Sequence, residues 1–142
     1  MRVLLDVNVL IALLDADHSL HARALEWFAG QARAGWASSP ITQNGCIRVM
    51  AHTGYPNPVP ASAVIDRLAE ATASNYHEFW PDDISVLDGR IADPQRIHGP
   101  RQITDVYLLA LAVRHGGRLA TFDVSIARDA VTAAQKRHIV FL

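Results

Sequence analysis

The sequence predicts an α/β domain in which a central, mostly parallel β-sheet is flanked by helices. The first observation behind this prediction is that short apolar runs alternate with longer segments of helical periodicity. The second is the length, because 142 residues suit one domain with a sizeable core. The third is the composition, which is 50% hydrophobic and 19% charged, as in globular proteins. We therefore expect one domain over residues 1–142.

The first half of the chain is predicted to form two strands and four helices. Gly35 ends the second helix, Pro40 suits the first turn of the third, and the loop 53–60 contains one Gly and three Pro. The expected strands are 2–5 and 36–39, and the expected helices are 7–15, 18–35, 40–52 and 61–73. Their expected core residues are Ala22, Leu25, Trp27, Phe28, Val64, Ile65 and Leu68.

The second half of the chain contains the clearest helix of the sequence. Residues 104–117 are apolar nearly all round, which predicts a central, buried helix. Thr104 is expected to cap this helix, and Gly116 with Gly117 to end it. The segment 82–103 has the least regular pattern. Further strands are predicted at 76–80, 118–122 and 138–142.

Charge and cysteine content restrict the classes of function and the compartment. The formal net charge of −1 gives no overall attraction to nucleic acid. Twelve of the thirteen basic residues are Arg, which favours local phosphate binding or, alternatively, reflects a general preference for Arg over Lys. Cys46 is the only cysteine, which fits a reducing cytoplasm. The apolar run 3–14 is too short to span a membrane and includes Asp6, so we expect neither a membrane segment nor a signal peptide.

Three aspartates stand at the joints between apolar elements. Asp6 follows the first strand, Asp105 lies in the first turn of the buried helix, and Asp123 follows the strand at 118–122. Each has a purely structural explanation, because Asp6 and Asp123 can cap a following helix and Asp105 suits the helix dipole. In open α/β sheets, however, ligands bind beyond the carboxyl ends of the strands.

Carboxylates that converge at such an edge repel one another and raise each other's pKa. A divalent cation removes this repulsion, and ligation by oxygen alone suits Mg²⁺ or Mn²⁺. Such a cation can polarise a phosphodiester oxygen and lower the pKa of an attacking water molecule. The three aspartates together therefore predict a metal site.

The stretches "LLDVNVLIAL", "SSPITQNGCIRVM" and "TDVYLLALAVRHGGRLATFD" resemble PIN-domain ribonucleases, and more narrowly the VapC toxins of bacterial toxin–antitoxin pairs. The resemblance implies a PIN-like fold and a metal-dependent endoribonuclease that cuts a structured RNA, such as a tRNA or rRNA loop. It also implies a VapB-type antitoxin and a homodimer. The site residues that it implies are the metal ligands Asp6, Asp105 and Asp123, with Asn8 orienting Asp6 and with Thr104 and Thr121 lining the pocket.

One position departs from the family pattern. Many PIN domains carry a Glu in a motif of the type T-x-x-E-x-x-R, whereas "TQNGCIR" has Gly45 there, with Thr42 and Arg48 in register. Three acids instead of four should bind a second metal weakly or not at all. Gly45 either allows close helix packing or marks a lineage without the Glu. We expect Gly45→Glu to supply the fourth acid.

Four arginines are candidates for RNA contact, each with a solvated surface position or a salt bridge as the alternative. They are Arg48, Arg90, Arg96 and Arg101, and the last three precede the buried helix.

Two other functions compete with the ribonuclease. The first is a weakened PIN module that binds RNA or an antitoxin without cutting, which Gly45 makes plausible. The second is a phosphotransfer protein with Asp6 as the acceptor, but "DVNVL" lacks the second Asp and the Gly-Thr that a haloacid-dehalogenase-like phosphatase needs.

Overall fold

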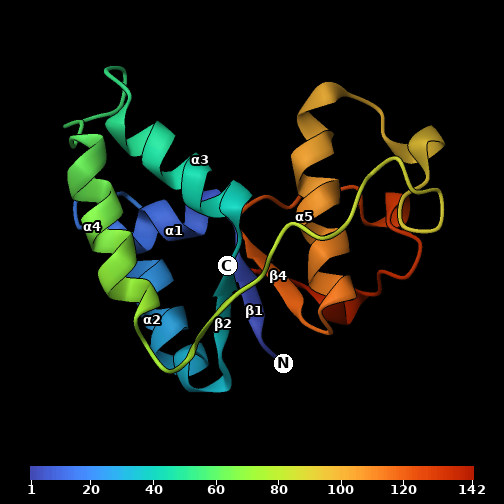
Figure 1. The fold of residues 1–142 in the computed structure, drawn as a ribbon, viewed down its shortest axis with the longest axis horizontal. Coiled ribbons are helices and arrows are strands. Elements are labelled where there is room, and N and C mark those ends of the chain that lie inside the picture. The colour runs from blue at the N-terminus through green and yellow to red at the C-terminus, as the bar shows by residue number, and fades with distance from the viewer.

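A parallel five-stranded sheet with strand order β3-β2-β1-β4-β5 runs through the centre of the molecule (Figure 1). The computed structural model describes all residues from 1 to 142. The predicted α/β architecture is confirmed, and every strand pair in the sheet is parallel. The strands are Val3–Leu5 (β1), Trp36–Ser38 (β2), His77–Phe79 (β3), Arg118–Thr121 (β4) and Ile139–Phe141 (β5).

Helices cover both faces of the sheet. Four of them lie on one side in Figure 1, and the fifth lies on the other side with the C-terminal part of the chain. β1 is buried on both faces, with Val3 and Leu5 in one apolar core and Leu4 in the other, which explains its unbroken apolar run. The helices are Val7–Leu14 (α1), His21–Gln31 (α2), Pro40–Ala51 (α3), Ala61–Thr72 (α4) and Ile103–Arg114 (α5).

The second helix begins three residues later than predicted. His18 accepts a hydrogen bond through Nδ1 from the backbone N–H of Leu20 (3.0 Å), which holds this segment in a turn before α2. The core prediction for this helix is wrong at Ala22 and Leu25, which are exposed, because α2 buries Ala24 instead. Ile65 in α4 is also exposed, whereas its predicted neighbours Val64 and Leu68 are buried.

The buried character of α5 is confirmed, but its start is not where the sequence predicts it. A short 3₁₀ turn at Pro100–Gln102 runs directly into the helix, so Gln102 takes the capping position and Thr104 lies inside the first turn. Every residue from 106 to 112 is buried. The helix ends before Gly116, whose φ of +67° suits glycine.

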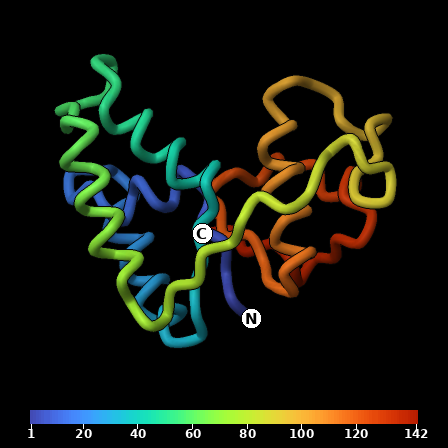
Figure 2. The backbone as a smooth tube through the Cα atoms, in the orientation of Figure 1, coloured from blue at the N-terminus to red at the C-terminus, as the bar shows by residue number.

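The segment that precedes α5 is irregular, as predicted. It contains a 3₁₀ turn at Pro94–Arg96 and an isolated bridge between Ala92 and Val131. This bridge joins it to the C-terminal part of the chain, which lies beside it in Figure 2. No helix is long and apolar enough to cross a membrane.

Candidate active site

The strand order brings Asp6 and Thr121 together, although 115 positions separate them in the sequence. β1 and β4 are neighbours in the sheet, and the Asp6 N–H continues their ladder by donating to the Ala120 carbonyl (3.0 Å). The Thr121 hydroxyl then donates to Asp6 Oδ2 (2.7 Å). The carboxyl edge of the sheet therefore holds Asp6 in one orientation.

Asp6 is also the N-cap of α1. Its Oδ1 accepts from the Val7 N–H (2.7 Å), so the structural explanation of this residue is correct. Its side chain is nonetheless buried, and this burial raises its pKa in spite of the hydrogen bonds from Thr121 and Val7. The capping role therefore leaves open a second role, because the buried charge is incompletely compensated.

Asp105 is the least compensated of the three carboxylates. It lies half-buried in the first turn of α5 and has no hydrogen bond or ion pair. Burial first, and then the negative charges of Asp6 and Asp123, raise its pKa to about 6. The three aspartates thus lie close enough to influence one another electrostatically.

Asp123 differs from Asp6 and Asp105, because residues of its own loop donate hydrogen bonds to its carboxylate. Its Oδ1 accepts from the backbone N–H (2.8 Å) and the hydroxyl (2.6 Å) of Ser125, and these bonds lower its pKa. No helix begins directly after Asp123, so it forms a local turn rather than a cap. Ser125 was not among the predicted site residues, although an Asp-x-Ser pattern after a strand is a recognisable turn signal.

Two observations bear on whether these residues suit a metal ion. No three His, Cys, Asp or Glu side chains are placed as a group that could hold a metal, and Asp123 is turned toward Ser125. On the other side, none of the three aspartates pairs with a cationic side chain, and burial raises the pKa of both Asp6 and Asp105. A pair of oxygen donors that lacks a counter-charge suits a hard divalent cation. The donor set fits, with Asp6 and Asp105 as its better-placed members.

Two other predicted site residues do not take part in these contacts. Asn8 is exposed and makes no side-chain hydrogen bond to Asp6. Thr104 is exposed on the first turn of α5 and makes no side-chain hydrogen bond either. Thr121 is therefore the polar residue that orients Asp6 in the structure.

The four candidate arginines do not form one cluster. Arg90 makes a bidentate pair with Asp88 (3.0 and 2.8 Å) and borders one pocket, whereas Arg96 borders another. Arg101 is exposed just before α5. Arg48 lies near the C-terminal end of α3, in a separate hollow.

Gly45 is buried where α3 crosses α1. A Cβ atom at this position would lie 2.7 Å from Val7 Cγ2, closer than a normal van der Waals contact. The packing explanation of Gly45 is therefore correct. The first carbon of any side chain would be directed at Val7, so the structure leaves no space for the Glu of Gly45→Glu unless Val7 moves.

Comparisons with known proteins agree with this geometry. The family model for the PIN domain matches residues 3–131. The chain is 55% identical over 142 residues to Ribonuclease VapC44 of Mycobacterium tuberculosis, and the match covers 100% of both chains.

Two solved structures share the fold at low sequence identity. One is VapC20 of Mycobacterium tuberculosis, described as a sarcin-ricin loop cleaving toxin, with a TM-score of 0.65, 12% identity and coverage of 93% of this chain and 98% of that one. The other is VapBC2 of Rickettsia felis bound to a DNA fragment from its promoter, with a TM-score of 0.53, 14% identity and coverage of 88% and 90%. On the family match and the full-length identity, this chain belongs to the PIN-domain family, among its VapC ribonucleases.

Proposed function

We propose that this protein is the toxin of a toxin–antitoxin pair, an endoribonuclease that hydrolyses RNA phosphodiester bonds with a divalent metal. The observation that carries the proposal is the pair of incompletely compensated carboxylates, Asp6 and Asp105, at the carboxyl edge of the sheet. The full-length relationship to a ribonuclease supports the same reaction. A structured RNA, such as a tRNA or rRNA loop, is the proposed substrate, and the cytoplasm is the proposed location.

The residues of the chain have separate roles in this proposal. Asp6, Asp105 and Asp123 would hold Mg²⁺ or Mn²⁺, and Thr121 fixes the Asp6 carboxylate by donating to Oδ2. When bound, the cation polarises a phosphodiester oxygen and helps to ionise the attacking water molecule. Ser125 keeps Asp123 ionised, because its two hydrogen bonds stabilise the carboxylate form.

The proposed partners are an antitoxin of the VapB type and a second copy of the chain. The VapBC2 structure of Rickettsia felis, which shares the fold, is a VapBC complex bound to promoter DNA and supports an antitoxin partner. Light scattering on the purified chain, alone and with the antitoxin, measures the mass of each assembly.

The competing function is a PIN module that binds RNA or an antitoxin without cutting. The observation that favours it is that no three acidic side chains are placed as a ready metal-binding group. It predicts RNA binding without metal-dependent cleavage.

Induced expression followed by sequencing of RNA 5′ ends separates the two functions. We expect the wild type to arrest growth and to create new RNA ends at a small number of sites. Asp6→Asn should do neither, because the neutral amide still caps α1 but lacks the charge that binds a cation. Asp66→Asn, on the exposed face of α4, is the matched control and should behave as the wild type.

Two results would decide against the proposal. New RNA ends at wild-type levels with Asp6→Asn would remove Asp6 from the reaction. No new ends with the wild type, in cells where the folded protein accumulates, would favour the non-cutting module.

A further inference from the structure

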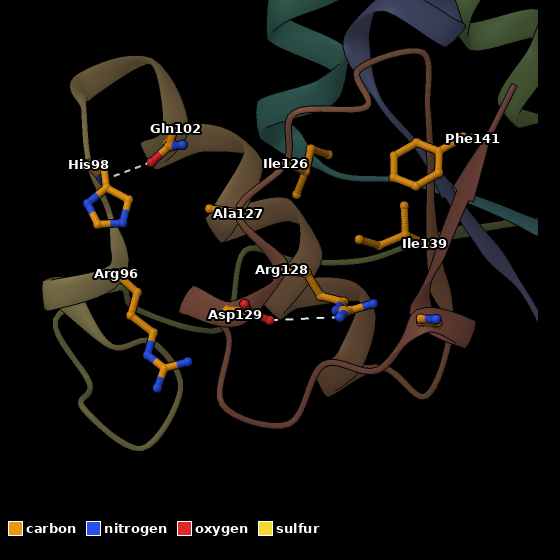
Figure 3. Close-up of a pocket in the computed structure, with 10 residues that line it drawn as sticks. Arg96, His98, Gln102, Ile126, Ala127, Arg128, Asp129, Ile139 and Phe141 are labelled. Carbon is orange, nitrogen blue, oxygen red and sulfur yellow. Dashed lines mark hydrogen bonds and ion pairs between the residues drawn. The ribbon is translucent and has the colours of Figure 1, made fainter.

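The structure contains a pocket of about 870 Å³, and Figure 3 shows the residues that line it. They come from three stretches of chain: 96–102, 126–129 and 136–141. Neither the family match nor the roles proposed above assign a ligand to this pocket.

The register of the sheet places the pocket next to the active site. Phe141 in β5 is the direct neighbour of Thr121 in β4, the residue that binds Asp6. Paired residues of parallel strands point to the same face, so Phe141 and Thr121 share a face of the sheet. Gln102, at the start of α5, and Ile126, three residues after Asp123, complete this side of the pocket.

The pocket carries more positive than negative charge. Arg96, Arg128 and Lys136 line it, and Asp129 is the only acidic residue of the lining. Arg96 also pairs with Asp93, which lies outside the lining (3.4 Å). Asp129 is exposed and lies 3.8 Å from the Arg128 guanidinium, a separation at which the pair contributes little. Lys136 is exposed and forms no ion pair. Because the whole chain has a net charge of −1, this surplus is a local feature.

Apolar side chains line one side of the pocket. Ile126, Ile139 and Phe141 are grouped on one side of the pocket in Figure 3, with Arg96 and His98 on the other. The Phe141 side chain is 50% exposed, although it occupies a strand of the central sheet. An exposed aromatic ring beside cations is the combination that binds an unpaired nucleotide, with its base stacked and its phosphate neutralised.

We propose that this pocket binds one unpaired nucleotide of the RNA substrate next to the bond that is cut. The base stacks on Phe141, and Arg128 with Lys136 contact the adjacent phosphate. This proposal rests on the proposed ribonuclease function, and it names the side chains that select a flexible RNA loop over a helix.

Equilibrium binding by the full-length protein tests the site without cleavage. The measurement uses fluorescence anisotropy in EDTA, with two labelled probes of equal charge: a short oligouridylate and an inorganic polyphosphate. Phe141→Leu should weaken oligouridylate binding at least about fivefold and leave polyphosphate binding unchanged, because only the RNA has bases to stack. The double variant Arg128→Ala/Lys136→Ala should weaken both probes and lower the salt slope by about 1.4.

The control is a second double variant that removes the same charge elsewhere. Arg23 and Arg33 are exposed cations on and after α2, which Figure 1 shows on the other side of the molecule. Arg23→Ala/Arg33→Ala should bind both probes as the wild type does. Thermal melting of each variant checks that it is folded.

Three results would overturn the proposal. The first is equal binding by the two double variants, and the second is a Phe141→Leu variant that affects both probes alike. The third is a folded wild type that binds neither probe. That result would favour an acidic protein segment as the ligand of the pocket. The binding assay omits metal, so it can succeed even if the protein does not cut RNA. RNA binding that depends on Phe141, together with no cleavage in cells, would refute the proposed ribonuclease function but not the proposed nucleotide site.

Discussion

At the scale of the residue, Asp105 has the most consequential environment in the molecule. Its folded-state pKa of about 6 lies above the ordinary value of 3.8, so the folded protein binds this proton more tightly than the unfolded chain does. The contribution of Asp105 to stability is therefore full below pH 3.8 and is lost as the pH rises through about 6. At neutral pH the ionised side chain opposes folding, unless a cation compensates it.

Replacing Asp105 by Asn should raise the Tm at pH 7.5 in EDTA, because it removes this uncompensated charge. Adding Mn²⁺ should raise the Tm of the wild type and have a much smaller effect on the variant, since a ligand that binds only the folded state stabilises it. Differential scanning fluorimetry with and without Mn²⁺ measures both effects. A Tm for Asp105→Asn below that of the wild type in EDTA would contradict the assigned environment, and Asp66→Asn controls for the loss of one charge.

Thr121 should act on the metal through Asp6. In Thr121→Val the hydroxyl that donates to Asp6 Oδ2 is lost while the side-chain volume is kept, so the pKa of Asp6 should rise further. We expect Mn²⁺ affinity to fall about tenfold, the lower end for loss of a residue that orients a ligand. Isothermal titration calorimetry measures this affinity. Thr121→Ser, which keeps the hydroxyl, should retain it, and equal affinities in all three proteins would exclude the positioning role.

The sequence predicted part of this site and not the rest. Asp6, Asp105 and Asp123 follow from their places at strand ends and at a helix start. The hydrogen bonds of Ser125 to Asp123, and the exposure of Asn8, depend on side-chain rotamers that a pattern of residue types does not determine. Asp6 is both an N-cap and a buried carboxylate that accepts from Thr121. This double role depends on the neighbouring strand β4, which the residue pattern does not identify.

At the scale of the element, the contact between α1 and α3 depends on Gly45. Gly45→Ala should gain about 0.8–1.0 kcal/mol from helix propensity. It should also lose about 1–3 kcal/mol, because its Cβ would lie 2.7 Å from Val7 Cγ2. We expect a net loss of stability in urea denaturation.

A double-mutant cycle isolates this contact. In a Val7→Ala background the opposing methyl groups are absent, so Gly45→Ala should become neutral or stabilising. A Gly45→Ala variant that is more stable than the wild type, with Val7 present, would show that α1 and α3 do not approach each other this closely.

The elements themselves were largely predictable, and the errors have local causes. α5 and β1 are recognisable because their apolar runs match elements that are buried all round. The predicted cap at Thr104 failed because the turn at Pro100–Gln102 continues into the helix. The start of α2 was misplaced because the His18 ring binds backbone in a turn, a contact that helical periodicity does not reveal.

At the scale of the whole molecule, the strand order creates the site. β1 and β4 are adjacent although the segment between them holds two strands and five α-helices, and this adjacency brings Asp6 near Asp123. Residue patterns alone predict parallel strands but not their order, so they place Asp6 and Asp123 at the carboxyl ends of strands without showing that these two strands are neighbours. The same order puts β5 at the edge beside β4, which positions Phe141.

The distribution of cations over the molecule makes a further prediction. Arg96 lines the pocket that contains Phe141 and pairs with Asp93 through one contact (3.4 Å), whereas Arg90 makes a bidentate pair with Asp88 and lines a different pocket. Arg96→Ala should therefore weaken RNA binding in EDTA and lower its salt slope by about 0.7, the value for one phosphate contact. Arg90→Ala removes an equal charge and should leave both quantities unchanged. If the two substitutions have equal effects on RNA binding, these effects come from the general surface charge and not from a contact in the pocket.

Cleavage by Asp105→Asn is the most direct test of the account, because this variant is expected to be at least as stable as the wild type. The assay incubates purified protein with the RNA identified by end sequencing, in EDTA or with Mn²⁺, and measures single-turnover cleavage rates. We predict that the wild type cleaves only with Mn²⁺ and that Asp105→Asn is at least about 100-fold slower, the scale of loss for transition-state charge stabilisation. Cleavage by the wild type in EDTA, or a wild-type rate from folded Asp105→Asn, would contradict a metal-dependent ribonuclease built on these aspartates.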